Sequence, residues 1–174
     1  LLIEIAKKIE KKYPFKNYII YVSRWEPRKK HELILEAFID LKLYETYSLL
    51  FIGDTTTENR KYNALFNTIT NYEIKSKIFC LQKLDFESMI MLLRGAKISI
   101  YPSVAEGFGI PPLESIAAKV PTLSSNLTAM SDFIFMSDFL FNPHNYEEFK
   151  IKLKTTLDND YDKRLNSLSH IVKD

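Results

Sequence analysis

Two segments of the sequence carry residue types that could bind an anionic ligand. The first, residues 22–30, reads Val-Ser-Arg-Trp-Glu-Pro-Arg-Lys-Lys and lies between a strand-like run and a helical stripe. Clustered cations beside a helix N-terminus favour an anion. A solvated basic turn is the alternative interpretation of this segment taken alone. The cations are Arg24, Arg28, Lys29 and Lys30.

The second segment, residues 103–114, contains Gly107 and Gly109, half of the four glycines in the chain. Glycine permits positive φ and close backbone approach. Pro111 suits the first turn of a helix, which leaves the amides of Gly109 and Ile110 available for a phosphate. A tight strand-to-helix turn is the alternative. The glycine spacing fits neither the Rossmann fingerprint nor the P-loop.

Glu106 and Glu114 bracket this turn, the first in the loop and the second about one helical turn into the helix. We expect them to be too far apart to share a proton, since a helix rises ~1.5 Å per residue. Two separated carboxylates near cations could accept hydrogen bonds from different hydroxyl groups of one ligand, for which a sugar is the obvious candidate. Glu114 could equally be a first-turn acid that stabilises the helix dipole.

Short apolar runs alternate with longer helical stripes, the pattern of an α/β fold with a parallel sheet covered on both faces. We predict a single doubly wound, Rossmann-like domain over 1–174 with about six mainly parallel strands. Ligands bind such sheets at the carboxyl ends of the strands. The expected strands are 18–22, 48–52, 77–81, 97–101, 122–124 and 139–141. The expected helices are 1–12, 31–43, 57–72, 86–94, 110–119 and 146–172, the last broken near residue 159, with Asp85 as an N-cap and Gly95 as a stop.

Composition narrows the class of protein. Of the 174 residues, 46% are hydrophobic and 26% charged, which excludes intrinsic disorder. The net charge of +2 is too small to indicate binding of nucleic acid. The longest apolar runs have five residues, which excludes a membrane-spanning helix. The single cysteine, Cys80, excludes an intrachain disulfide and fits a cytoplasmic location. Because the sequence starts Leu-Leu-Ile without Met, we expect a fragment.

The motifs, taken together in order, resemble the C-terminal domain of the group 1 glycosyltransferases, which are retaining enzymes with two Rossmann-like domains (the GT-B fold). The resemblance covers residues 18–155. The motifs that carry it are Val22-Ser23-Arg24 with Lys29, Pro102-Ser103, Glu106-Gly107-Phe108-Gly109-Ile110-Pro111-Pro112-Leu113-Glu114, Pro121 and Ser125-Asn126.

The resemblance implies a role for each motif residue. Arg24 and Lys29 would hold the diphosphate of a nucleotide-sugar donor and stabilise charge on the leaving group. Glu106 would contact the transferred sugar, and Glu114 the ribose hydroxyls. The catalytic set is thus Arg24, Lys29 and Glu106, and the donor-binding set adds Leu84, Phe108, Gly109, Ile110 and Glu114. Leu84 would contact the base through its backbone.

The resemblance also implies what lies outside these motifs. No enzyme nucleophile is expected, and the leaving diphosphate would help to deprotonate the acceptor on the same face of the sugar. No cofactor or metal is expected either, since the nucleotide sugar is a substrate. The N-terminal domain, which would bind a glycan or lipid-linked acceptor, is absent from the sequence. In the full-length protein we expect a cytoplasmic location, peripheral to the inner face of the membrane. Ser23, Gln82 and Lys119 stand where family members usually have Gly, and Ser23 is expected to restrict how closely the diphosphate approaches the backbone.

The remaining candidate motifs favour structural roles. Asp158-Asn159-Asp160 imitates an Asp-x-Asp metal motif but lies between two terminal helices, where turn and capping chemistry is expected. His31, His144 and His170 have no ligand spacing and are expected on the solvated surface. Cys80 is expected to be an inert core residue.

Two other functions remain open from the sequence. One is a non-catalytic α/β module that binds a phosphorylated metabolite. The other is half of a sugar-nucleotide epimerase, although this segment shows no acid/base residues for that reaction.

Overall fold

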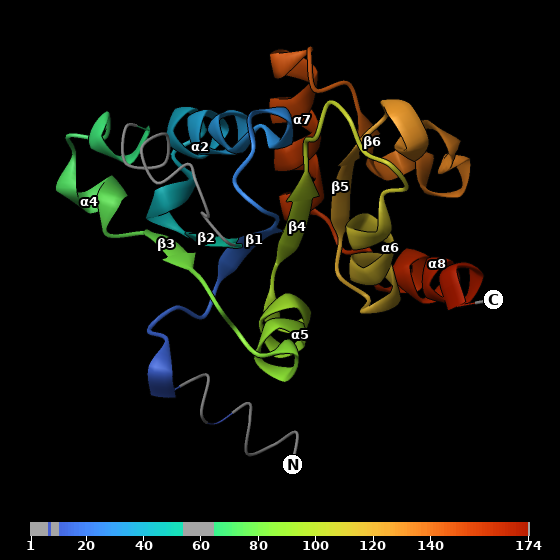
Figure 1. Cartoon of the computed structure of the whole chain (residues 1–174), viewed down its shortest axis with the longest axis horizontal. Coiled ribbons are helices and arrows are strands. Elements are labelled where there is room, and N and C mark those ends of the chain that lie inside the picture. Colours follow the sequence, from blue (N-terminus) through green and yellow to red (C-terminus); the bar gives the residue numbers. More distant parts are fainter. Residues whose placement is uncertain (1–6, 8–10, 54–64, 174) are drawn as a thin grey trace.

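The computed structural model describes residues 7, 11–53 and 65–173, in which six parallel strands form one sheet (Figure 1). The strand order is β3-β2-β1-β4-β5-β6, so the predicted doubly wound Rossmann-like α/β domain is confirmed. The strands are β1 (Tyr18–Val22), β2 (Ser48–Ile52), β3 (Ile78–Leu81), β4 (Ile98–Tyr101), β5 (Thr122–Ser125) and β6 (Leu140–Phe141).

The strands form where the sequence has continuous apolar runs because both faces of the sheet are covered. In β1, Ile19 and Ile20 point to opposite faces and both are fully buried. Strand β1 pairs with β2 from Tyr18 to Val22 and with β4 on its other side. The strand order therefore runs outward from β1 to β3 on one side of the sheet and from β4 to β6 on the other. The boundary between β1 and β4 is the topological switch point.

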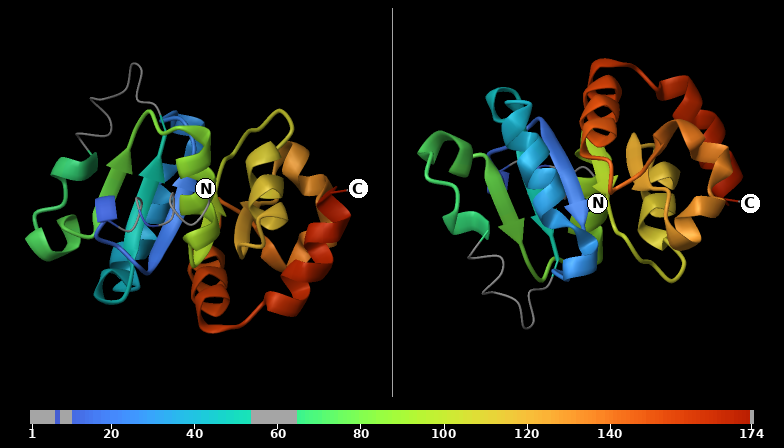
Figure 2. Two further views of the ribbon diagram at one scale, coloured as in Figure 1. Left: turned by 90° about the horizontal axis from the view of Figure 1, so that it is seen from below. Right: turned by 90° about the horizontal axis from the view of Figure 1, so that it is seen from above.

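The described helices cover both faces of this sheet. Ile34 and Phe38 of α2 pack with Ile19, whereas Leu92 of α5 packs with Ile20, and Figure 2 shows α2 and α5 on opposite sides. The helices are α2 (His31–Asp40), α4 (Tyr72–Lys75), α5 (Phe86–Gly95), α6 (Ile110–Ala117), α7 (Tyr146–Asp158) and α8 (Asp162–Lys173). Short 3-10 helices are η1 (Pro27–Lys29), η2 (Leu43–Glu45), η3 (Thr128–Asp132) and η4 (Ile134–Phe139).

Local signals set the ends of α5, as predicted. The Asp85 carboxylate accepts a hydrogen bond from the amide of Ser88 at 2.8 Å and caps the helix. The helix ends at Gly95, where an added Cβ would lie 2.6 Å from the hydroxyl of Tyr18. That hydroxyl donates to the carbonyl oxygen of Leu92 at 2.6 Å, so the glycine allows β1 and α5 to approach closely.

Several boundaries differ from the sequence-based expectations. The helix expected at 31–43 ends at Asp40, because Lys42 adopts a left-handed conformation with φ 52° before η2. The helix expected at 110–119 ends at Ala117, and Lys119 has φ 62°. The break expected near residue 159 is confirmed by the separation of α7 and α8. The helix expected at 1–12 lies largely outside the described residues, as does the first half of the helix expected at 57–72. The continuous helix expected up to residue 72 is wrong, because the described half is helical only over 65–67 and a separate helix, α4, begins at Tyr72.

None of the helices in the described part of the chain combines the length and the hydropathy that crossing a bilayer requires.

Candidate functional site

A cavity of about 230 Å³ lies at the switch point, beyond the carboxyl ends of β1 and β4. Open parallel sheets bind their ligands at this position, outside the carboxyl ends of the strands at the switch point. The loop after β1 lines one side of the cavity and the loop after β4 lines the other. The lining residues are Tyr21, Val22, Ser23, Arg24, Lys29, Tyr101, Glu106, Pro111, Pro112 and Met130.

The loop after β1 is held by hydrogen bonds to the sheet and to its own end. The amide of Ser23 donates to the carbonyl oxygen of Ile52 at 2.8 Å, which continues the ladder beyond β1. The hydroxyl of Tyr21 donates to the carbonyl oxygen of Lys29 at 2.8 Å. At the end of β2, a Cβ added to Gly53 would lie 1.9 Å from the Ser23 carbonyl oxygen. The segments after β1 and β2 can therefore approach this closely only with glycine at position 53.

The central interaction of the site is an ion pair between Lys29 and Glu106, whose side chains are 12% and 17% exposed. Glu106 also lies 3.4 Å from Nη1 of Arg28. Burial alone raises the pKa of Glu106, but hydrogen bonds from Lys29 and Ser103 and the charges of Lys29 and Arg28 outweigh it, so the pKa is lowered. Glu106 is therefore ionised at neutral pH.

Arg28 joins the two loops through both its backbone and its side chain. Its carbonyl oxygen accepts from the amide of Val104 at 2.9 Å, and its Nη1 donates to the carbonyl oxygen of Ala105 at 2.6 Å. Its Nε donates to the carboxylate of Glu26 at 2.7 Å. From the sequence alone, Arg28 is one of four clustered cations and has no distinct role. Its position as a link between the loops depends on the β1–β4 pairing.

Arg24 and the start of α6 occupy the remaining walls of the cavity. The side chain of Arg24 is 72% exposed, and its Nε lies 3.6 Å from the carboxylate of Glu26. Because Pro111 and Pro112 have no N–H, Ile110 provides the amide of the first turn of α6. The site thus combines the accessible guanidinium of Arg24, the mostly buried ammonium group of Lys29 and a helix N-terminus, an arrangement suited to an anion.

Gly109 shapes the start of α6. It is the N-cap with φ 78°, and an added Cβ would lie 2.8 Å from Cγ of Met130 in η3. Gly107 does not have a positive φ, so the expected use of left-handed backbone applies to Gly109 alone. The amide of Glu106 donates to the hydroxyl of Thr128 at 3.0 Å, which anchors this loop on η3.

The structure brings Arg24, Lys29 and Glu106 together around the cavity and leaves the other predicted site residues outside its lining. Phe108 and Ile110 are 65% and 54% exposed at the turn into α6. Glu114 is exposed one turn further along this helix, and Leu84 packs beside α5. Their roles stay predictions.

His31 is not on the surface, contrary to expectation. It is 3% exposed, and its ring stacks on Trp25 with the centroids 3.9 Å apart. Its Nε2 has no hydrogen-bond partner among the described residues. Burial, and secondly the charge of Lys29, lowers the pKa of His31 to about 3, so the ring is neutral. The sequence predicts only that His31 lies at the start of a helix. Its burial depends on a tertiary contact with Trp25, which the sequence pattern does not show.

The Asp158–Asp160 segment adopts the expected turn. The carboxylate of Asp160 accepts from the amide of Asp162 at 2.8 Å, and the side-chain amide of Asn159 donates to the carbonyl oxygen of Thr155 at 2.7 Å. No group of three potential metal ligands occurs within the described part of the chain. Cys80 lies in β3 and is half-buried.

The sequence profile of the family described as "Glycosyl transferases group 1" matches residues 3–171, nearly the whole chain. The chain belongs to this family. The resemblance seen in the motifs is thereby confirmed at the level of the family and fold.

Curated relatives carry mannosyltransferase names. The chain is 26% identical over 158 residues to the serotype-specific mannosyltransferase WbdA of Escherichia coli, covering 88% of this chain and 19% of that protein. It is also 26% identical over 140 residues to the O-antigen chain mannosyltransferase RfbU of Salmonella typhimurium, covering 79% of this chain and 38% of that protein. The chain thus spans well under half of the length of these relatives.

Solved structures show the same fold. A glycosyltransferase from Rickettsia africae superposes with a TM-score of 0.82 at 24% identity, over 97% of this chain and 46% of that one. The C-terminal domain of the group 1 family protein LpcC from Francisella tularensis gives a TM-score of 0.76 at 22% identity, over 97% of this chain and 85% of that domain. A C-terminal domain of this family is therefore comparable in extent to the chain.

Proposed function

We propose that this chain is the donor-binding part of a retaining glycosyltransferase and binds a nucleotide-diphosphate sugar in the switch-point cavity. The observation that carries the proposal is the convergence of Arg24, Lys29 and Glu106 on that cavity. Family membership favours a transferase over a non-catalytic module or an epimerase half.

The diphosphate would take Lys29 as its main partner by displacing Glu106 from it. Arg24, already exposed at the mouth of the cavity, can turn onto the same phosphates, and the Ile110 amide of α6 can add a neutral donor. These groups would stabilise the charge that grows on the leaving diphosphate more strongly than they stabilise the intact donor, which lowers the barrier.

The released Glu106 carboxylate would then accept hydrogen bonds from the transferred sugar. Glu114, exposed on α6, would accept from the ribose, while Phe108 and Gly109 line the approach and the backbone of Leu84 contacts the base. We assign no enzyme nucleophile, cofactor or metal to the reaction. The leaving diphosphate would take the acceptor proton on the same face of the sugar, which gives retention.

The acceptor would come from outside this chain. We propose a glycan or lipid-linked acceptor held by an N-terminal domain, in a cytoplasmic enzyme that builds a cell-surface polysaccharide. The names of the curated relatives make a mannosyl donor the first to test. By itself the chain is expected to bind donor weakly and to transfer no sugar.

Calorimetric titration with uridine, guanosine and adenosine diphosphates and their hexoses tests the proposal. Lys29→Gln and Arg24→Gln should each weaken binding roughly 10- to 150-fold, the value of a charged hydrogen bond. Lys154→Gln, on the exposed surface of α7, is the matched control and should bind as the parent does. Equal affinity in all three variants would refute a donor site at this cavity. Because Arg24 is exposed, its variant remains informative even if Lys29→Gln folds poorly.

A further inference from the structure

Thr128, the first residue of η3, has a backbone conformation that its residue type disfavours. Its φ is 52°, in the left-handed region, where a β-branched side chain is strained. The other non-glycine residues with positive φ in the described part of the chain are all lysines, which are not branched at Cβ. Glycine would adopt this conformation without strain, and what threonine adds instead is a hydroxyl group.

The hydroxyl of Thr128 anchors the loop after β4. Its oxygen accepts from the amide of Glu106 at 3.0 Å. Within the described residues, no other protein acceptor is bonded to a backbone amide of residues 105–108. A Cβ added to Gly107 would meet no atom within 4 Å, so the loop is open beyond this contact. Thr128 therefore fixes the backbone of the loop at Glu106.

The segment around Thr128 is held on both sides, which maintains the strained conformation. Before it, the amide of Leu127 donates to the hydroxyl of Ser125 at 3.1 Å. After it, the hydroxyl of Ser131 donates to the Thr128 carbonyl oxygen at 2.7 Å, and Met130 is fully buried. Because a β-branched side chain is stiff at χ1, the hydroxyl keeps one direction, toward the loop after β4.

The contact with Thr128 acts on the backbone of Glu106, whereas Lys29 and Arg28 act on its side chain. In the proposed donor complex the diphosphate takes Lys29, and the side-chain contact is lost. The hydrogen bond of the amide does not involve the carboxylate and can persist through this exchange. It thus limits where the released carboxylate can lie.

We propose that Thr128 is a positioning residue for sugar binding: its hydroxyl fixes the loop of Glu106, so that the carboxylate faces the transferred sugar once the diphosphate has taken Lys29. The strained backbone is the structural cost of bringing that hydroxyl to the Glu106 amide. The inference rests on the proposed function, because the sugar contact of Glu106 belongs to it.

Three substitutions separate the hydroxyl of Thr128 from its backbone strain. Thr128→Val removes the hydroxyl and keeps the β-branched shape, Thr128→Ser keeps the hydroxyl, and Thr128→Gly removes both the hydroxyl and the strain. Calorimetric titration of each uses guanosine diphosphate mannose and guanosine diphosphate, or the corresponding uridine or adenosine pair if that pair binds the parent more tightly.

Thr128→Val and Thr128→Gly should each weaken the nucleotide sugar about 5-fold, the effect of one lost hydrogen bond, and leave the bare diphosphate unchanged. Thr128→Ser should bind both ligands as the parent does. The thermal midpoint of Thr128→Gly should be at least that of the parent, because glycine relieves the strain. A residue that only supported the fold would not lose sugar affinity while keeping stability.

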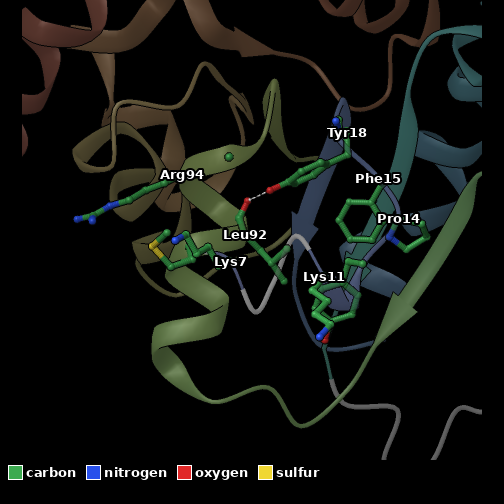
Figure 3. A pocket seen from close by; sticks show the side chains of 11 residues that line it. Lys7, Lys11, Pro14, Phe15, Tyr18, Leu92 and Arg94 are labelled. Atoms are coloured by element: carbon green, nitrogen blue, oxygen red, sulfur yellow. Dashed lines mark hydrogen bonds between the residues drawn. The ribbon is translucent and has the colours of Figure 1, made fainter. Parts of the chain in front are cut away.

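Tyr18→Phe is the matched control for a lost hydroxyl. Figure 3 shows that the Tyr18 hydroxyl also joins distant segments, since it donates to the Leu92 carbonyl oxygen at 2.6 Å. Tyr18 begins β1, at the opposite end of the strand from the switch-point cavity. Tyr18→Phe should therefore lower the thermal midpoint and keep both affinities.

Carbon-13 NMR of the Glu106 carboxyl group gives a readout that needs no ligand. Burial raises the pKa of this carboxyl, but its contacts with Lys29, Ser103 and Arg28 outweigh burial and hold the pKa below its usual value. In Thr128→Val the loosened loop should move the pKa of Glu106 upward, whereas Tyr18→Phe should leave it unchanged.

Equal losses on the two ligands in Thr128→Val would show general support of the cavity and overturn the proposal. Unchanged affinity of that variant for the nucleotide sugar would also overturn it, as would an equal loss in Thr128→Ser. If the parent binds neither ligand, the donor site fails and the pKa of Glu106 decides alone. An unchanged pKa in Thr128→Val then overturns the positioning of Glu106, and a raised pKa supports it.

Discussion

Lys29 and Glu106 form an ion pair that joins the loop after β1 to the loop after β4, and both side chains are mostly buried. The residue expected to bind phosphate therefore holds the residue expected to bind the sugar. An anionic ligand that reaches Lys29 must compete with Glu106 for it. This exchange would couple occupation of the diphosphate position to release of the carboxylate toward the sugar.

Arg28 should act on donor binding by positioning, since it contacts the loop that carries Glu106. We expect Arg28→Ala to weaken binding of a nucleotide sugar about 5-fold, the effect of one lost hydrogen bond. Arg164 is a matched control, because it is similarly exposed and donates to a carboxylate at 2.8 Å and a backbone carbonyl at 2.7 Å. Calorimetry should show full affinity in Arg164→Ala, and equal affinity in the two variants would contradict the positioning role.

His31 should make stability depend on pH. Its pKa is about 3 in the folded chain against 6.5 when unfolded, so the unfolded state binds the proton more readily. The contribution of neutral His31 to the free energy of unfolding is therefore complete above pH 6.5 and is lost as the pH falls toward 3. Between pH 6.5 and 4 the free energy of unfolding should fall by on the order of 3 kcal/mol.

Urea unfolding at several pH values should show a flatter pH profile for His31→Phe. The exposed His144 provides the control, and His144→Gln should retain the parent profile. If His31→Phe follows the same pH profile as the parent, the assigned neutral state of His31 is incorrect.

The sequence predicts the positions of the strands well, because the strands are buried on both faces and most of them are therefore unbroken apolar runs. All six strands were located within one residue of their observed ends. The position of the cavity follows as well, since Arg24, Lys29 and Glu106 each come shortly after β1 or β4.

What the sequence could not provide depends on contacts between distant segments. Burial of His31 under Trp25, the link made by Arg28 and the pairing of Lys29 with Glu106 all require the register of the sheet. The hydrogen bond from the Glu106 amide to the Thr128 hydroxyl likewise joins segments that are distant in the sequence.

Lys119 adopts a left-handed conformation directly after α6, with φ 62°. A side chain there costs ~1–2 kcal/mol, which glycine avoids. Lys119→Gly should therefore raise the free energy of unfolding by about 1 kcal/mol. Lys154→Gly, inside α7, should lower it by about 1 kcal/mol. Chemical denaturation of both variants checks the opposite signs, and destabilisation by Lys119→Gly would argue against the assigned conformation.

Metal removal should not affect nucleotide binding, because Asp160 caps the start of α8 and the proposed site uses protein cations. We expect the same affinity in chelator and in magnesium, and the same affinity for Asp160→Asn. An affinity that disappears with chelator and returns with magnesium would contradict this account of the site.

The measurement that tests the central claim most directly is calorimetric titration of Glu106→Gln and Glu114→Gln with a nucleoside diphosphate and with its sugar. Glu114→Gln should weaken both ligands roughly 10- to 150-fold, since both contain ribose. Glu106→Gln should weaken the nucleotide sugar and leave the bare diphosphate at least as tightly bound, because Lys29 loses its competing partner. Equal losses on the two ligands for Glu106→Gln, or no loss on either for Glu114→Gln, would contradict the assignment of these carboxylates to the donor.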